Sequence, residues 1–87
     1  MASNNSTQHL TLTGSAQQLA NAPVFNGVTI TAKSTNTGDV GVGFTSGVTA
    51  TNAYVLEKGQ SIKLQVPNTN AIFVNGTASD IVSTIGS

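Results

Sequence analysis

The chain has 87 residues, which is enough for one domain and too few for a second. Three lysines balance three acidic residues, arginine is absent, and charged residues make up 7% of the chain, against about 25% in an average soluble domain. This composition excludes the basic footprint of a nucleic-acid-binding domain. It favours a small module that gains stability by associating with copies of itself or with another protein.

Cysteine is also absent, so disulfides cannot reinforce a domain of this size. No segment approaches the roughly 18 consecutive apolar residues of a membrane span. Residues 1–6 lack the basic and apolar regions of a signal peptide. We therefore expect synthesis in a cytoplasm and no membrane partner.

Alternating apolar and polar residues recur along the chain, and this period of two is typical of half-buried strands. Helix-like composition is confined to 16–20, which is too short to form a stable helix. In chain order, we predict strands at 9–13, 28–33, 40–44, 61–66, 72–74 and 80–85, with two further short strands at 17–19 and 54–56.

Turn signals separate these strands at short intervals, and the Asn-Gly pairs among them suit the positive φ angles of tight hairpins. These signals are Asn26–Gly27, 36–39, Lys58–Gly59, 67–70 and Asn75–Gly76. Six to eight short strands predict an all-β fold, a single small antiparallel β-sandwich of jelly-roll-like form. A closed barrel is the alternative architecture. Phe25, Phe44 and Phe73 are expected in the core.

The start of the chain differs from the rest. Residues 1–8 are polar, uncharged and aperiodic, so we predict a flexible N-terminal arm there and a β-sandwich domain over 9–87. The arm is expected either to order on a partner or to be a plain mobile terminus.

Catalysis needs titratable groups gathered in one site, and this chain has few of them. His9 is the single histidine, and no serine lies in a nucleophile motif such as G-x-S-x-G. The acids Asp39, Glu57 and Asp80 are dispersed. We therefore predict that the protein is not an enzyme and binds no cofactor or metal. Asn36, Asp39 and nearby carbonyls are the kinds of group that form weak calcium sites, but an Asx-type turn explains the same residues without a metal.

The glycine-rich run at 38–47 does not fit a phosphate-binding loop. After Gly41 and Gly43, the third glycine of G-x-G-x-x-G should fall at Ser46, and no G-K-S/T follows. Alternation instead places both glycines on one bare strand face, which we expect to pack against a neighbouring subunit or a loop. The predicted partner or subunit interface comprises Asn4, Asn5, Thr7, His9, Leu10, Gly41 and Gly43.

Several stretches, taken in their order, resemble a group of short bacteriophage virion proteins. They are VTITA at 28–32, NTGDVGVG at 36–43, GVTA at 47–50, LEKGQSI at 56–62 and IFVNG at 72–76. The resemblance implies a β-sandwich module of the capsid decoration or cement type without catalytic residues. It also implies binding to the major capsid protein at capsomer junctions, a homotrimer, and a place on the outer capsid surface after synthesis in the bacterial cytoplasm.

Two other classes of function remain open at this point. The first is a structural module of a phage fibre, tail or baseplate, with host-surface glycan as a further partner. The second is a small glycan-binding or enzymatic domain, for which Tyr54 is the only aromatic candidate with a polar edge.

Overall fold

The computed structural model describes residues 6–49 and 53–87, which form eight strands and one short 3₁₀ helix. The elements are β1 (Ser6–Thr11), β2 (Gln17–Gln18), β3 (Val28–Ala32), β4 (Val40–Gly43), β5 (Tyr54–Leu56), β6 (Ser61–Leu64), η1 (Thr69–Ala71), β7 (Phe73–Gly76) and β8 (Ile81–Gly86). Each strand predicted from the alternation is present, with bounds that differ by a few residues.

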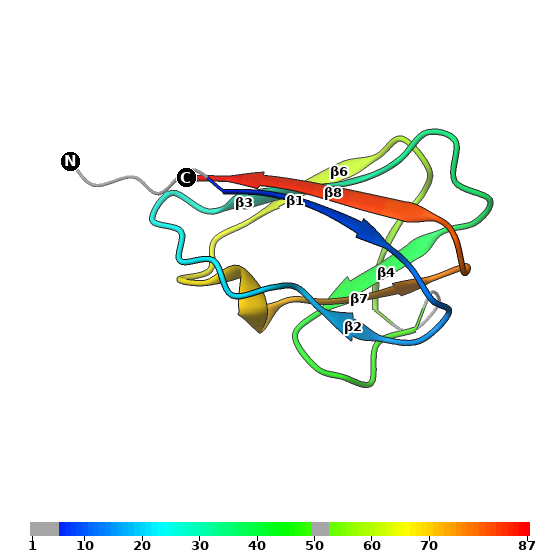
Figure 1. Cartoon of the computed structure of the whole chain (residues 1–87), viewed down its shortest axis with the longest axis horizontal. Helices are drawn as coiled ribbons and strands as arrows, with labels where there is room; N and C mark the ends of the chain where they lie inside the picture. Colours follow the sequence, from blue (N-terminus) through cyan, green and yellow to red (C-terminus); the bar gives the residue numbers. More distant parts are fainter. Residues whose placement is uncertain (1–5, 50–52) are drawn as a thin grey trace.

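The strands form two four-stranded sheets, ordered β1-β8-β3-β6 in the first and β2-β7-β4-β5 in the second (Figure 1). All the pairings between these strands are antiparallel. Successive strands alternate between the two sheets, except for β4 and β5, which are neighbours in the second sheet. This arrangement is an eight-stranded jelly roll, so the predicted fold class is confirmed.

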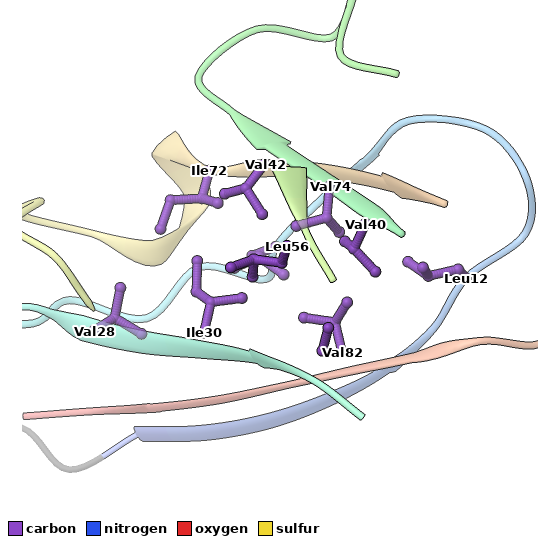
Figure 2. Close-up of a cluster of buried hydrophobic side chains, with 11 residues drawn as sticks. Leu12, Val28, Ile30, Val40, Val42, Leu56, Ile72, Val74 and Val82 are labelled. Atoms are coloured by element: carbon purple, nitrogen blue, oxygen red, sulfur yellow. The ribbon is translucent and has the colours of Figure 1, made fainter. Parts of the chain in front are cut away.

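Aliphatic side chains from both sheets meet in a single core (Figure 2). Val28, Ile30 and Ala32 of β3 are buried while Thr29 and Thr31 between them are half-exposed, as the alternation predicts. The core consists of Leu12, Leu19, Val28, Ile30, Ala32, Val40, Val42, Leu56, Ile72, Val74 and Val82. It therefore contains no aromatic side chain.

The prediction that the phenylalanines lie in the core was wrong for Phe25 and Phe44, which are 57% and 59% exposed. The alternation would place Phe44 on the buried face with Val40 and Val42. However, β4 ends at Gly43, so Phe44 lies outside the strand. Phe25 lies in the connection between β2 and β3, where its backbone N–H donates to Ser87 O at 2.8 Å. Phe73 is half-buried on β7, opposite Gly43.

Asn75–Gly76, predicted as a turn, instead lies inside β7. Asn75 pairs with Gly41 and Gly76 pairs with Val40. A Cβ on Gly76 would lie 2.8 Å from Leu12 Cδ1, so the residue is needed for close packing against the core and not for a positive φ angle.

The predicted boundary between arm and domain at residue 9 falls inside β1, because this strand begins at Ser6. Gln8, predicted in the arm, ties the first sheet to the rest of the domain. Its Nε2 donates to Thr69 Oγ1 at 2.9 Å, and its Oε1 accepts from Ala20 N at 3.0 Å. The rest of the predicted arm, residues 1–5, lies outside the described residues.

Asn36 attaches the connection between β3 and β4 to the start of β8. Its Nδ2 donates to Ile81 O at 2.9 Å, and its Oδ1 accepts from Ile81 N at 2.8 Å. Both polar groups of this buried side chain are therefore used within the fold. Asn36 therefore has a structural part, but its side chain binds Ile81 rather than the backbone of its own turn, so the predicted Asx-type turn was wrong; Asp39 is exposed.

Asp80 strengthens the same attachment. Its two carboxylate oxygens accept from Thr37 N at 2.8 Å and from Gly38 N at 2.9 Å. These backbone hydrogen bonds lower the pKa of Asp80, since they stabilise the charged form, and the bond from Thr37 has the larger effect. Burial opposes the shift without cancelling it.

Thr84 Oγ1 is buried and has no hydrogen-bond partner among the described residues. We expect Thr84→Val, which removes this hydroxyl at nearly constant volume, to raise the free energy of unfolding by about 1 kcal/mol. Thr69→Val is the matched control, because Thr69 Oγ1 donates to Ala20 O at 2.6 Å. It should lower the free energy of unfolding by about 1–3 kcal/mol. Urea denaturation measures both changes, and a destabilised Thr84→Val variant would contradict the prediction.

The lowered pKa of Asp80 predicts a pH dependence of stability. Because the folded pKa lies below the unfolded one, this group's contribution is present above the unfolded pKa and is lost as pH falls through the folded pKa. Thermal unfolding should therefore move to lower temperature below about pH 4. Asp80→Asn should be less stable than wild type at neutral pH and should lose less stability on acidification. Parallel pH slopes for the two proteins would be the contrary result.

Candidate interaction surface

The two ends of the sandwich differ in charge. The start of β1, the end of β8 and the connections 19–27, 44–49 and 65–72 belong to one end of the strands, and their sequences contain no Lys, Arg, Asp, Glu or His (Figure 1). We call this the charge-free end. The opposite connections, 12–16, 33–39, 57–60 and 77–80, form the charged end and contain every charged side chain except Lys63.

The large apolar side chains that the core leaves out lie toward the charge-free end. Four are more than half exposed: Phe25, Phe44, Tyr54 and Ile85. Phe44 directly follows β4, while Tyr54 begins β5 opposite Val42, so these two residues lie at the same end of the β4–β5 pair. We call them the aromatic pair. Exposed aromatic side chains on a domain with an aliphatic core are typical of contact surfaces.

A hollow of about 340 Å³ lies on the outer face of the first sheet, next to the start of β1 and the end of β8. We call it the terminal hollow. A cross-strand row of four residues contributes to its lining, because Thr7 pairs with Ile85, Ile85 with Thr29, and Thr29 with Lys63. The full lining is Ser6, Thr7, Asn26, Gly27, Thr29, Lys63, Ile85, Gly86 and Ser87.

The terminal hollow is poorly suited to acid–base chemistry. Lys63 is the only Lys, Arg, Asp, Glu or His side chain that lines it, so it offers no pair of groups that could exchange a proton with a substrate. Elsewhere in 6–49 and 53–87, no group of three His, Asp or Glu side chains is placed to hold a metal ion. The hollow can offer hydroxyl groups, the methyl groups of Thr7, Thr29 and Ile85, and one ammonium group.

The predicted interface residues are not brought together. Thr7 and His9 are exposed on the outer face of the first sheet, whereas Leu10, the residue after His9, lies on the opposite face and packs against the core. Leu10 is therefore not free to contact a partner as predicted. Asn4 and Asn5 lie outside the described residues.

Gly41 and Gly43 lie on β4 in the second sheet, where Gly41 is buried and Gly43 half-buried. The bare glycine face was predicted to pack against a neighbouring subunit or a loop. At Gly43 it packs against a loop, because a Cβ there would lie 2.6 Å from Val48 Cγ1. Asn75 Nδ2 donates to Val48 O at 2.9 Å, which holds this loop against the sheet. The chain thus covers part of its own bare glycine face.

The sequence analysis did not predict that Phe44 and Ile85 are exposed, because it assigned them to strands from the alternation alone. Phe44 continues the pattern of Val40 and Val42, and only the following Thr-Ser-Gly indicates that the strand stops. Ile85 belongs to a strand with apolar residues on both faces, so its sequence gives no preferred face.

Comparison with known proteins identifies no family for this chain. No protein-family profile matches it, and no curated protein matches it either. A solved structure described as "Bacillus endospore appendages form a novel family of disulfide-linked pili" has a similar fold, with a TM-score of 0.56 and 16% sequence identity. The similarity covers 97% of this chain and 85% of that chain. At this identity it supports the fold alone.

The described part of the chain contains no helix with the length and apolar character needed to cross a membrane.

The contact between Val48 and Gly43 predicts a stability effect. Gly43→Ala would force Val48 to move, so we expect the free energy of unfolding to fall by about 1 kcal/mol or more. Gly47→Ala, in the same connection, is the control, because its Cβ would meet nothing closer than Thr45 Oγ1 at 3.9 Å. Chemical denaturation measures both variants. Equal stabilities would show that Val48 does not constrain the position.

Proposed function

We propose that this protein is a structural subunit of a multi-copy protein assembly and carries out no reaction. The observation that carries the proposal is the separation of side chains between the two ends. All charged residues except Lys63 belong to the charged end, while the exposed apolar residues lie toward the other. A charge-free surface with exposed aromatic residues costs little to desolvate, which suits contact with another protein.

The absence of strong net charge supports the same proposal. Three basic and three acidic residues leave a formal net charge of zero, so copies of the chain do not repel one another at long range. Many copies can therefore lie close together, as a fibre or a shell requires.

One candidate assembly is a fibre built from copies of this chain. The similarity in fold to a chain from disulfide-linked pili supports the fibre candidate, since in those pili a chain of this fold is part of a fibre. This chain has no cysteine, so its own contacts would be wholly non-covalent. A phage fibre, tail or baseplate module belongs to the same class.

The other candidate is a bacteriophage capsid decoration protein, supported by the sequence resemblance over 28–85. In this role the protein would bind the major capsid protein as a trimer at capsomer junctions and stabilise the head. Jelly rolls are common among viral capsid proteins, although a fold hosts many functions and cannot decide between these two.

Electron microscopy and light scattering of the purified protein separate the candidates. A fibre subunit should form filaments at high concentration without any other protein. A decoration protein should remain a small oligomer and saturate undecorated phage heads at a fixed copy number. A strictly monomeric protein that binds neither itself nor a capsid would overturn the proposal.

A further inference from the structure

The structure holds an exposed aromatic pair and a hollow with a single charged side chain, Lys63, at two separate places on one chain. We infer that the terminal hollow is a docking site for the aromatic pair, Phe44 and Tyr54, of a second copy. This inference rests on the proposed function, and it specifies which surfaces join the copies.

The terminal hollow has the size and chemistry for an aromatic side chain. Its volume of about 340 Å³ falls within the range of small binding pockets. Ile85, 65% exposed, offers an apolar contact at its wall. Lys63 lies in the same cross-strand row, and no acidic side chain lines the hollow to pair with it. Its ammonium group is therefore placed to make a cation–π contact with an inserted ring.

The aromatic pair is the complementary feature. Phe44 is 59% and Tyr54 60% exposed, and they lie at the end of the second sheet, whereas the hollow lies on the outer face of the first. Their exposed surface amounts to roughly 100 Å² each. Burying it in a hollow that no acidic side chain lines gains apolar contact and sets the ring against the Lys63 ammonium group.

A second copy fits this site because the chain supplies both halves of the contact and has no net charge to resist association. Since the two surfaces differ, the contact is heterologous and leaves one free hollow and one free aromatic pair at the ends of every open oligomer. Such a contact propagates into a filament or closes into a ring, according to the rotation between neighbours.

The area involved predicts weak individual contacts. The aromatic pair contributes roughly 200 Å², well short of the roughly 800 Å² per partner of a standard stable interface. Oligomers should therefore dissociate on dilution and become stable only where many contacts act together.

Complementation between two defective variants tests the inference. Phe44→Lys places a charge on the aromatic pair, and Ile85→Lys places the same charge in the hollow. Each variant alone should lose self-association, with the association constant at least about tenfold below that of wild type. At high concentration an equimolar mixture should form a dimer and nothing larger, because one variant retains the hollow, the other retains the aromatic pair, and only one contact can form between them. Sedimentation velocity over a concentration series measures all three samples.

Thr35→Lys is the matched control, because it adds the same charge at an exposed position of the charged end. It should associate like wild type, and circular dichroism should show all variants folded. The inference is overturned if wild type stays monomeric at every concentration, if Phe44→Lys and Ile85→Lys associate like wild type, or if their mixture forms no dimer. Monomeric wild type that still saturates phage heads would overturn this inference and leave the proposed function standing.

Discussion

The contact between the two sheets through aliphatic side chains is the interaction on which the rest of the structure depends. Val, Ile and Leu from both sheets fill the space between them, and no aromatic ring enters it. Branched aliphatic side chains suit pleated, half-buried strands and allow close approach of the layers. Gly76 shows how close this approach is, since a Cβ there would lie 2.8 Å from Leu12 Cδ1. A core filled in this way leaves the aromatic residues for the surface.

A domain of this size with no cysteine needs other ways to hold its connections in place. Side-chain hydrogen bonds to the backbone do this at both ends. At the charged end, Asn36 and Asp80 bind Ile81, Thr37 and Gly38. Toward the charge-free end, Gln8 joins the edge strand β1 to the connection after β2 and to η1. These contacts stabilise the loops without adding surface charge, so the charge-free end stays free of ions.

The jelly roll therefore presents two chemically different ends on one rigid body. The charged end keeps its ionised groups in water or, for Asp80, within backbone hydrogen bonds. The other end offers exposed aromatic side chains and the terminal hollow, in which Lys63 is the single charged side chain. This separation is the basis of the proposed assembly subunit, because it supplies a contact surface at one end.

The sequence by itself determined the strands and, for β3, which residues face inward, because the alternation of Val28, Ile30 and Ala32 is a local property that survives in any sheet. It also determined that the chain has only three lysines, three acidic residues and one histidine. Which strands pair was decided only by the tertiary structure: the turn signals favoured hairpins between successive strands, yet only β4 and β5 are successive neighbours. The terminal hollow could not be predicted for the same reason. Its row of residues comes from β1, β8, β3 and β6, which become adjacent only when the jelly roll closes.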